Sequence, residues 1–337
     1  MKKIVHLIPY DGIGGVESAA NTMKDLVFDD IDFNIFFIFD RKRKNFLNPY
    51  KFIHSAYELI KIKPDLLVVS LWRSCITAII VKFFKPKTKI VLFLHYPHHY
   101  HFVDMFFTKL MSKLSLSIWA DSQDTLDSRL PNYPKERSYI ISFVARKLKP
   151  IENLISEPNF IFWGRLHEQK CIDRSIKIFS KIKANYENAK FIIIGPDGGM
   201  ASTLKGIADE LKIKDNIHFV GLKNLSSIID LALKSSFYLQ TSKLEGMAMS
   251  VVEAMQLGLL PVVTPVGEIK NYCEHNKNAI IIRDDADAVS CILALIKDKD
   301  MYLNLRNGAI NKWKNYEIYS ESFIRTSKLI MDFNFEK

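Results

Sequence analysis

Two glutamates stand eight positions apart in a short stretch that begins like a loop and ends like a helix. The stretch is KLEGMAMSVVEAM, residues 243–255, and its two carboxylates belong to Glu245 and Glu253. Eight residues of continuous helix would rotate the second side chain by about 80° from the first and move it by about 12 Å along the axis. This spacing therefore does not predict an acid–base pair on one helix face.

Two cations follow a strand-like run earlier in the same half of the chain. In FIFWGRLHEQK, residues 160–170, the apolar run ends at Gly164, and Arg165 and Lys170 precede a helical pattern that starts near Ile172. The first backbone N–H groups of a helix lack intrahelical partners and attract anions. The pattern predicts an anion site, although two ordinary solvated charges remain the alternative.

Glycines end two further apolar runs of the second half. Gly195 follows a strand pattern in IIIGPDGG, and Gly221 does the same in FVGLK. Together with Gly164 they predict three loops at one edge of a sheet, an arrangement that suits a nucleotide.

The first strand-like run is also followed by glycines, in DGIGGVES, residues 11–18. A dinucleotide-dependent dehydrogenase is not supported, because the third glycine of the GxGxxG pattern would fall on Glu17. Gly14 and Gly15 lack a Cβ atom at an expected strand-to-helix turn, so the backbone there can approach a ligand phosphate or sugar closely.

Short apolar runs alternate with helical patterns along the whole chain, which predicts parallel sheets covered on both faces. At 337 residues, the chain is long enough for two domains. We therefore expect an α/β protein with two doubly wound, Rossmann-like domains, over residues 1–150 and 151–315. The linker between them is expected within residues 144–159, which contain two prolines and little periodicity.

The formal net charge of +10 is unevenly spread. Residues 1–150 contain 23 Lys and Arg against 14 Asp and Glu, or +9, which leaves +1 for the rest. A basic half suggests an anionic partner. There is no apolar run of about 18 residues and no leader pattern after Met1, so we expect a cytoplasmic protein. The four cysteines stand singly, which predicts buried thiols, not a disulfide framework or a zinc site.

These motifs carry a resemblance. The chain resembles the GT-B glycosyltransferases, in particular the large retaining family 4 group (glycosyl transferases group 1), which uses nucleotide-sugar donors. The matching features are Gly164-Arg165 with Lys170, the glycine loops at Gly195 and Gly221, LEGMAMSVVEAMQLGLLPVVTPVGE (residues 244–268), and GGVES after the first strand. They span about the whole chain.

The resemblance implies a role for each site residue. Glu245 is implied to reach the hydroxyls of the donor sugar, and Glu253 to accept hydrogen bonds from the nucleotide ribose. Arg165 and Lys170 are implied to stabilise the departing diphosphate. The backbone near a helix start at Met249 is implied to contact that diphosphate, through the segment Gly246, Met247, Ala248, Met249 and Ser250. For Glu253, an exposed helix position is the alternative.

The histidine-rich run LHYPHHYH contains His95, His98, His99 and His101. Metal binding is one interpretation of such a cluster. The family resembled requires no metal, and only His95 matches its strand-end histidine, which touches the donor sugar. We therefore expect His95 to contact the sugar and expect neither a metal nor a separate cofactor.

The chain departs from the family pattern at three positions. Ala248 replaces a usual Gly or Pro and Cys171 replaces a usual Gly, and both replacements are small. Glu268 adds a carboxylate near the expected diphosphate, where it would be repulsive unless it faces sugar hydroxyls or solvent.

Residues 316–337 are expected to form a terminal helix that crosses back to the first domain, as in the fold resembled. Residues 81–89 are rich in lysine, and Phe107, Leu110, Met111 and Leu114 follow helical spacing with Lys109 and Lys113 beside them. This pattern suggests a peripheral membrane protein, with ordinary core packing as the alternative.

The predicted function is transfer of a sugar, with retention, from a nucleotide-diphosphate sugar to a saccharide acceptor. A UDP-sugar is expected over a GDP-sugar. The acceptor is expected to be lipid-linked, as in assembly of a bacterial surface polysaccharide such as lipopolysaccharide. A sugar-nucleotide epimerase of related fold and a non-catalytic sugar-binding relict remain the alternatives.

Overall fold

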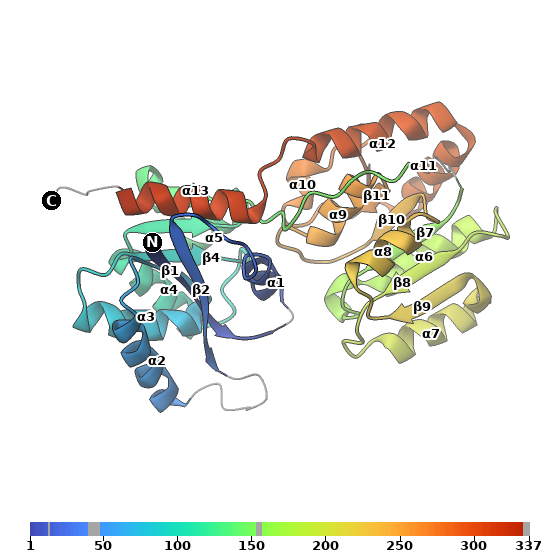
Figure 1. The fold of residues 1–337 in the computed structure, drawn as a ribbon. Coiled ribbons are helices and arrows are strands. Elements are labelled where there is room, and N and C mark those ends of the chain that lie inside the picture. The colour runs from blue at the N-terminus through green and yellow to red at the C-terminus, as the bar shows by residue number, and fades with distance from the viewer. Residues whose placement is uncertain (13, 40–47, 153–156, 333–337) are drawn as a thin grey trace. The chain divides into compact units, whose positions relative to one another are not determined.

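The computed structural model describes residues 1–12, 14–39, 48–152 and 157–332. The chain divides into two compact units, Met1–Arg146 together with Glu317–Lys337, and Lys147–Tyr316 (Figure 1). The boundary at Arg146 lies within the expected linker, of which residues 153–156 fall outside the described residues. The terminal segment returns to the first unit, and residues 333–337 of it likewise fall outside the description.

The first unit is built on a parallel sheet with the strand order β2-β1-β3-β4-β5-β6. Its strands are β1 (Lys2–Tyr10), β2 (Ile31–Phe39), β3 (Leu66–Ser70), β4 (Ile90–Leu94), β5 (Ser117–Ala120) and β6 (Ser138–Ile140). Its helices are α1 (Gly15–Asn21), α2 (Pro49–Ile62), α3 (Trp72–Phe84), α4 (Phe102–Leu114), α5 (Gln123–Arg129), the 3-10 helix η1 (Lys135–Arg137) and α13 (Tyr319–Asp332).

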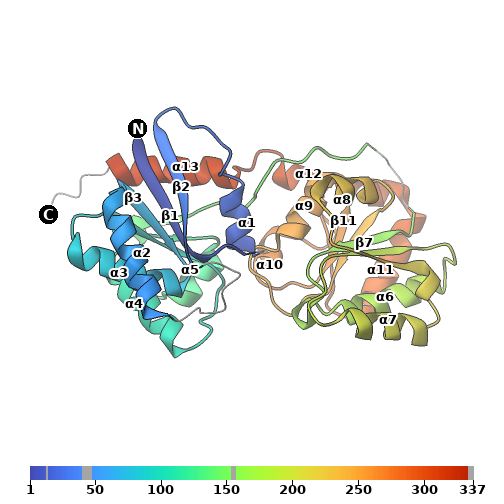
Figure 2. The same cartoon turned by 60° about the horizontal axis from the view of Figure 1, so that its bottom comes forward.

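Helices cover both faces of this sheet, because its central strands are apolar on both sides. Every residue of β3 and of β4 is buried. One face packs Leu67, Leu92 and their neighbours against α2, α3 and α4. On the other face α13 lies along the sheet in both views (Figures 1 and 2), and its Phe323 ring lies 5.2 Å from that of Trp119.

The second unit repeats the design with the strand order β12-β11-β10-β7-β8-β9. Its strands are β7 (Phe160–Trp163), β8 (Phe191–Ile194), β9 (Ile217–Gly221), β10 (Phe237–Gln240), β11 (Leu260–Val263) and β12 (Ile280–Ile281). Its helices are η2 (Glu168–Lys170), α6 (Ile172–Lys183), α7 (Ala201–Glu210), η3 (Lys214–Asn216), α8 (Leu225–Ala232), α9 (Met249–Leu257), α10 (Ile269–Tyr272), α11 (Asp285–Lys297) and α12 (Lys299–Trp313).

The predicted fold class is confirmed. The two sheets are parallel and doubly wound, and each strand coincides with an apolar run of the sequence. In each sheet the strand order reverses once, between β1 and β3 in the first unit and between β7 and β10 in the second. In open α/β sheets, ligands bind beyond the carboxyl ends of the strands at such a switch point.

Two expectations about helices need correction. In the sequence, apolar residues follow helical spacing from Val16 to Val27 and predict one helix over that range, but α1 ends at Asn21 and Val27 is exposed. The apolar stripe of α4 packs inward: Met111 is fully buried, and Phe107 and Leu114 contact the same core. The apolar face of α4 therefore packs against the sheet, which agrees with the alternative of ordinary core packing.

Candidate functional site

The side chains that the sequence singled out in the second unit gather at its switch point. Lys170 lies on the loop that follows β7, and Glu245 lies on the loop that follows β10. Because β7 and β10 are neighbours in the sheet, their carboxyl ends bring these two loops together.

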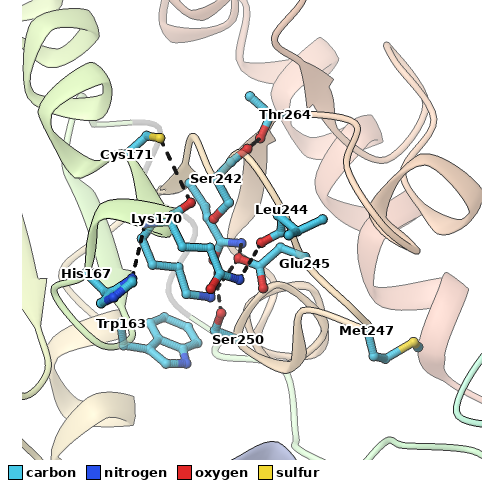
Figure 3. A network of polar contacts seen from close by, with 12 residues as sticks. Trp163, His167, Lys170, Cys171, Ser242, Leu244, Glu245, Met247, Ser250 and Thr264 are labelled. Atoms are coloured by element: carbon cyan, nitrogen blue, oxygen red, sulfur yellow. Dashed lines mark hydrogen bonds and ion pairs between the residues drawn. The ribbon is translucent and has the colours of Figure 1, made fainter. Parts of the chain in front are cut away.

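Lys170 and Glu245 form an ion pair, in which Nζ lies 2.6 Å from Oε1. Their side chains are 18% and 8% exposed. The side-chain amide of Gln240 donates to the same oxygen at 3.0 Å. Figure 3 shows the two charged side chains pointing toward each other from their separate loops. Both contacts use Oε1, so they leave the Oε2 side of the carboxylate outside this pairing.

Gln240 is held in one orientation by two hydroxyl groups. Its Oε1 accepts from the Tyr238 hydroxyl at 2.8 Å and from the Ser250 hydroxyl at 3.1 Å. Burial raises the pKa of Tyr238 well above its usual value, so this hydroxyl stays protonated and remains a donor. The amide N–H₂ is thereby directed at Glu245. These hydrogen bonds in a buried site fix the geometry of the carboxylate.

Glu253 lies on α9 and is partly buried. The indole Nε1 of Trp163 donates to its Oε2 at 3.0 Å. Trp163 is the last residue of β7 and is 5% exposed. The alternative of an exposed helix position for Glu253 is therefore wrong, because the carboxylate is anchored to the neighbouring strand.

The helix α9 begins at Met249, as expected, directly after the loop that carries Glu245. Met247 and Ala248, which precede it, are 9% and 7% exposed. The Ser250 side chain belongs to the first turn and is engaged with Gln240. The first-turn amides of α9 therefore lie beside the Lys170 and Glu245 pair, with the positive end of the helix dipole among them.

Two positions at which the chain departs from the pattern of the family resembled, Ala248 (usually Gly or Pro) and Cys171 (usually Gly), adopt left-handed backbone conformations. Ala248 has φ of 54° and Cys171 has φ of 46°. Side chains with a Cβ are disfavoured there, so the replacements are small in volume but strained in backbone. The Thr241 hydroxyl donates to the Cys171 carbonyl at 2.6 Å and holds that turn in place.

The three predicted glycines lie at the ends of adjacent strands. Gly164 N–H donates to the Ile194 carbonyl and Gly195 N–H donates to the Gly221 carbonyl, each at 2.9 Å. A Cβ on Gly195 would lie 1.8 Å from the Gly164 carbonyl oxygen, so only glycine fits there. Around Gly221 and Gly246 the space is open. Arg165, next to Gly164, is exposed.

Glu268 also lies beside this network. Its backbone N–H donates to the Gly246 carbonyl at 3.0 Å, and its Oε2 accepts from Asn271 at 3.1 Å. Within the described residues, its buried Oε1 has no hydrogen-bond partner. A buried carboxylate oxygen without a donor is costly, so this atom is suited to receive a ligand hydroxyl.

The remaining predicted site residues belong to the first unit. Gly14 precedes α1, and a Cβ there would lie 2.3 Å from a carboxylate oxygen of Glu17. At Gly15 a Cβ would meet nothing closer than 3.7 Å, so glycine is not required by space at that position. His95 follows β4, is 6% exposed, and contacts Ser70 at 2.9 Å through Nε2.

Two other histidines of the run, His99 and His101, have structural partners. His101 caps α4, because its Nδ1 accepts from the Asp104 N–H at 3.1 Å. His99 Nε2 lies 3.3 Å from the Arg129 carbonyl, and burial lowers the pKa of this histidine. In the part of the chain that the structure describes, no three His, Cys, Asp or Glu side chains gather in a cluster that could hold a metal ion.

Sequence reasoning missed Gln240, Tyr238 and Trp163. A usable signal existed for two of them: Gln240 is a polar residue at the end of the apolar run SFYLQT, and Trp163 directly precedes Gly164. Apart from the contact between Tyr238 and Gln240 within β10, their partners lie on other elements, so those pairings were not visible in the sequence.

Comparison with known proteins agrees with this geometry. Residues 145–312 match the family model for glycosyl transferases group 1. An uncharacterized glycosyltransferase of Methanocaldococcus jannaschii is 24% identical over 383 residues, covering 90% of this chain and 89% of that protein. The gpi3 subunit of phosphatidylinositol N-acetylglucosaminyltransferase from Schizosaccharomyces pombe is 24% identical over 168 residues, covering 49% of this chain and 37% of that protein.

Among solved structures, HepE of Anabaena in complex with UDP-glucose superposes with a TM-score of 0.78. The match covers 98% of this chain and 99% of HepE, at 16% sequence identity, and it establishes the likeness of fold. The comparisons therefore support a glycosyltransferase with the GT-B fold, whose residues 145–312 match the family model for glycosyl transferases group 1.

Proposed function

We propose that this protein is a retaining, metal-independent glycosyltransferase of the family 4 type that transfers a hexosyl group from a nucleoside-diphosphate sugar to a saccharide acceptor. The observation that carries the proposal is the Lys170 and Glu245 ion pair at the switch point, beside the first turn of α9. The pair places a cation for a diphosphate next to a carboxylate for sugar hydroxyls. Each group meets a different part of one elongated ligand.

In this proposal the ligand runs along the loops of the second unit. Glu253, oriented by Trp163, accepts the ribose hydroxyls. The first-turn amides of α9 and the side chains of Arg165 and Lys170 receive the diphosphate. Glu245 uses Oε2 for the sugar, since Lys170 and Gln240 already donate to Oε1. We propose a UDP-sugar as donor, supported by the likeness of fold to HepE with UDP-glucose.

The chemical step requires charge stabilisation more than acid–base chemistry from the protein. As the sugar leaves, negative charge grows on the diphosphate, and Lys170, Arg165 and the helix dipole are positioned to stabilise it. The leaving phosphate itself takes the proton of the acceptor hydroxyl, on the same face of the sugar that the acceptor enters. This front-face course retains the configuration of the anomeric carbon.

Lys170 can serve the diphosphate without abandoning Glu245. An ammonium carries three donors, and one of them occupies Glu245 Oε1. Without a ligand the pair is neutral, which limits the cost of burying either charge. The remaining donors are available for phosphate oxygens once the donor substrate binds.

A panel of nucleotide-sugars tests the donor. The donor that binds should raise the melting temperature, because a ligand at 100 times its dissociation constant stabilises the folded state by about 2.7 kcal/mol. Turnover should release free nucleoside diphosphate and a glycosylated acceptor. Appearance of an epimerised sugar nucleotide would instead indicate the epimerase, and binding without turnover on any acceptor would indicate the non-catalytic relict.

For the acceptor we propose a lipid-linked saccharide of a bacterial surface polysaccharide such as lipopolysaccharide, reached at an anionic membrane surface. The name of the Schizosaccharomyces pombe relative includes phosphatidylinositol, which supports a lipid class of acceptor for this proposal. On the first unit, Phe83 and Phe84 are 80% and 63% exposed at the end of α3. Lys85 and Lys87 follow them on the surface, so this segment joins apolar and basic groups. No helix in the described part of the chain is long and apolar enough to cross a membrane.

Liposome co-sedimentation at graded anionic lipid content tests the membrane contact. Of the lysines in residues 81–89, Lys82 donates to the Thr88 carbonyl and Lys89 donates to the Met331 carbonyl. Lys85→Glu with Lys87→Glu is therefore the sharper variant, since these two side chains are exposed. Reduced sedimentation of the variant at low salt would support the proposal. A wild-type protein that stays in the supernatant at every composition would remove the membrane contact, while the transferase proposal would stand.

A further inference from the structure

A chain of polar side chains crosses the first unit's sheet from the middle of β1 to the carboxyl ends of β3, β4 and β5. His6 Nε2 lies 2.7 Å from the Ser70 hydroxyl oxygen, and that oxygen lies 2.9 Å from His95 Nε2. On the far side of the ring, His95 Nδ1 lies 3.7 Å from Asp121 Oδ2. His6 and Ser70 are fully buried, and His95 and Asp121 are 6% and 8% exposed.

The surroundings of this chain are apolar and aromatic. The Phe93 ring lies 4.2 Å from the His95 ring, and the Phe323 ring of α13 lies 5.5 Å from the His6 ring. Apolar side chains could fill these buried positions at a lower free-energy cost. A buried row of polar side chains therefore suggests a functional role, since it includes His95, a proposed ligand contact.

The single hydroxyl hydrogen of Ser70 limits how the protons can be arranged. Ser70 can donate to only one of the two imidazoles, so the other must donate to Ser70. His6 is neutral, because burial, helped by the nearby His95, lowers its pKa from 6.5 to about 3. His6 therefore carries one ring proton, and with a neutral His95 two arrangements are open.

The position of Asp121 decides between them. If His95 donated from Nε2 to Ser70, its Nδ1 lone pair would face the Asp121 carboxylate, and the two would repel each other. If His6 donates to Ser70 and Ser70 donates to His95 Nε2, the proton of His95 sits on Nδ1, between the ring and the carboxylate. In both arrangements His6 Nδ1 lacks a partner among the described residues, so that atom does not affect the choice.

We propose that Ser70 and His6 are positioning residues that hold His95 as the Nδ1–H tautomer, with this N–H toward Asp121, and so fix the orientation of the ring that the proposed function places against the donor sugar. At 3.7 Å from Asp121, this N–H is oriented by the carboxylate without a short hydrogen bond. The role of the ring toward the donor sugar rests on the proposed function. The tautomer itself does not.

Long-range ¹H–¹⁵N correlation spectra of the histidine-labelled full chain test the tautomer without any assay. The chain has nine histidines, and the signals of His95 are assigned by their loss in His95→Gln. The expected spectrum has a protonated Nδ1 and an unprotonated Nε2 for His95. A protonated Nε2 in the wild-type protein would overturn the proposal, and this measurement needs no variant of the positioning residues.

Matched substitutions test the positioning role. Ser70→Ala removes the donor to Nε2 and should yield a mixture of His95 tautomers. His6→Gln places an amide N–H near the former Nε2 and should keep the wild-type tautomer, whereas His6→Phe keeps the ring shape without the donor and should shift toward the mixture. An unchanged Nδ1–H signal in Ser70→Ala would refute the role of Ser70.

Kinetics connect the tautomer to the proposed reaction. Turnover should fall about tenfold in Ser70→Ala, the effect of one lost hydrogen bond, with binding of free nucleoside diphosphate unchanged. His6→Gln should restore turnover relative to His6→Phe. Equal turnover in Ser70→Ala and wild type would refute the link to catalysis. Absence of transfer from every donor would refute the proposed function while leaving the spectroscopic result intact.

Discussion

The ammonium of Lys170 and the carboxylate of Glu245 meet at 2.6 Å, although the two residues are 75 positions apart in the chain. Each lies on a loop at the carboxyl end of a different strand, and the two strands are neighbours at the switch point of the second sheet. This relationship joins the anion-binding side of the site to its hydroxyl-binding side.

Lys170→Met should reduce turnover by a factor on the order of 10² to 10³, because the lost cation stabilises charge that grows in the transition state. It should also lower the free energy of unfolding by about 1–3 kcal/mol, since Glu245 is left buried without its cation. Steady-state kinetics and urea unfolding measure the two effects.

Lys177→Met is the matched control, because Lys177 forms an exposed pair with Asp173 at 3.8 Å on α6. It should leave turnover unchanged and alter stability by less than about 0.5 kcal/mol. Near-normal turnover in Lys170→Met would contradict the assigned mechanism.

Trp163→Phe should weaken nucleotide binding with little effect on turnover at saturating donor. The substitution removes the indole N–H that orients Glu253, and one lost hydrogen bond corresponds to a rise in dissociation constant of about five- to tenfold. Isothermal titration with nucleoside diphosphate measures it. Trp119→Phe is the control, since this buried indole N–H in the first unit has no partner among the described residues. Equal affinity in both variants would exclude the orienting role of Trp163.

Cys171→Gly and Ala248→Gly should each raise the free energy of unfolding by about 0.5–1 kcal/mol. Both residues have left-handed backbones, where glycine lacks the Cβ clash, and part of the gain is lost to the greater freedom of glycine in the unfolded chain. Ala208→Gly, inside α7, should instead lower it by about 1 kcal/mol. Thermal and urea unfolding measure whether each substitution raises or lowers the free energy of unfolding. If all three substitutions lowered it, the backbone at Cys171 and Ala248 would not be strained.

His6 should make the stability of the protein depend on pH in the acid range. Its folded-state pKa is about 3, below the ordinary 6.5, so between these values the unfolded chain binds a proton that the folded chain does not. The contribution of His6 to the free energy of unfolding should therefore be complete above pH 6.5. It should fall as the pH drops, by up to about 1.4 kcal/mol per pH unit.

Urea unfolding of wild type and His6→Gln between pH 4.5 and 7 measures this dependence. Glutamine does not titrate, so the variant should lose that part of the slope. Identical slopes would mean that His6 is not held neutral by the fold.

The sequence by itself determined the fold class and the identity of most polar groups at the site. Strands such as β3 and β4 are short, wholly apolar and bounded by helical patterns, and such runs are stable only inside a covered parallel sheet. Lys170 was visible because it follows a strand-like run and precedes a helical pattern, Glu245 because it stands beside a glycine, and Glu253 because it lies within an apolar helix. Local spacing was enough for these inferences, because they concern one element at a time.

Only the tertiary structure decided which groups meet. The pairing of Lys170 with Glu245 depends on the adjacency of β7 and β10, and the orientation of Glu253 depends on Trp163 from another strand. The stripe of α4 that contains Met111 faces the core, whereas Phe83 at the end of α3 faces solvent, and both look equally apolar in the sequence. The periodicity of the sequence indicates that a helix has an apolar face. The direction of that face is set by the sheet against which the helix packs.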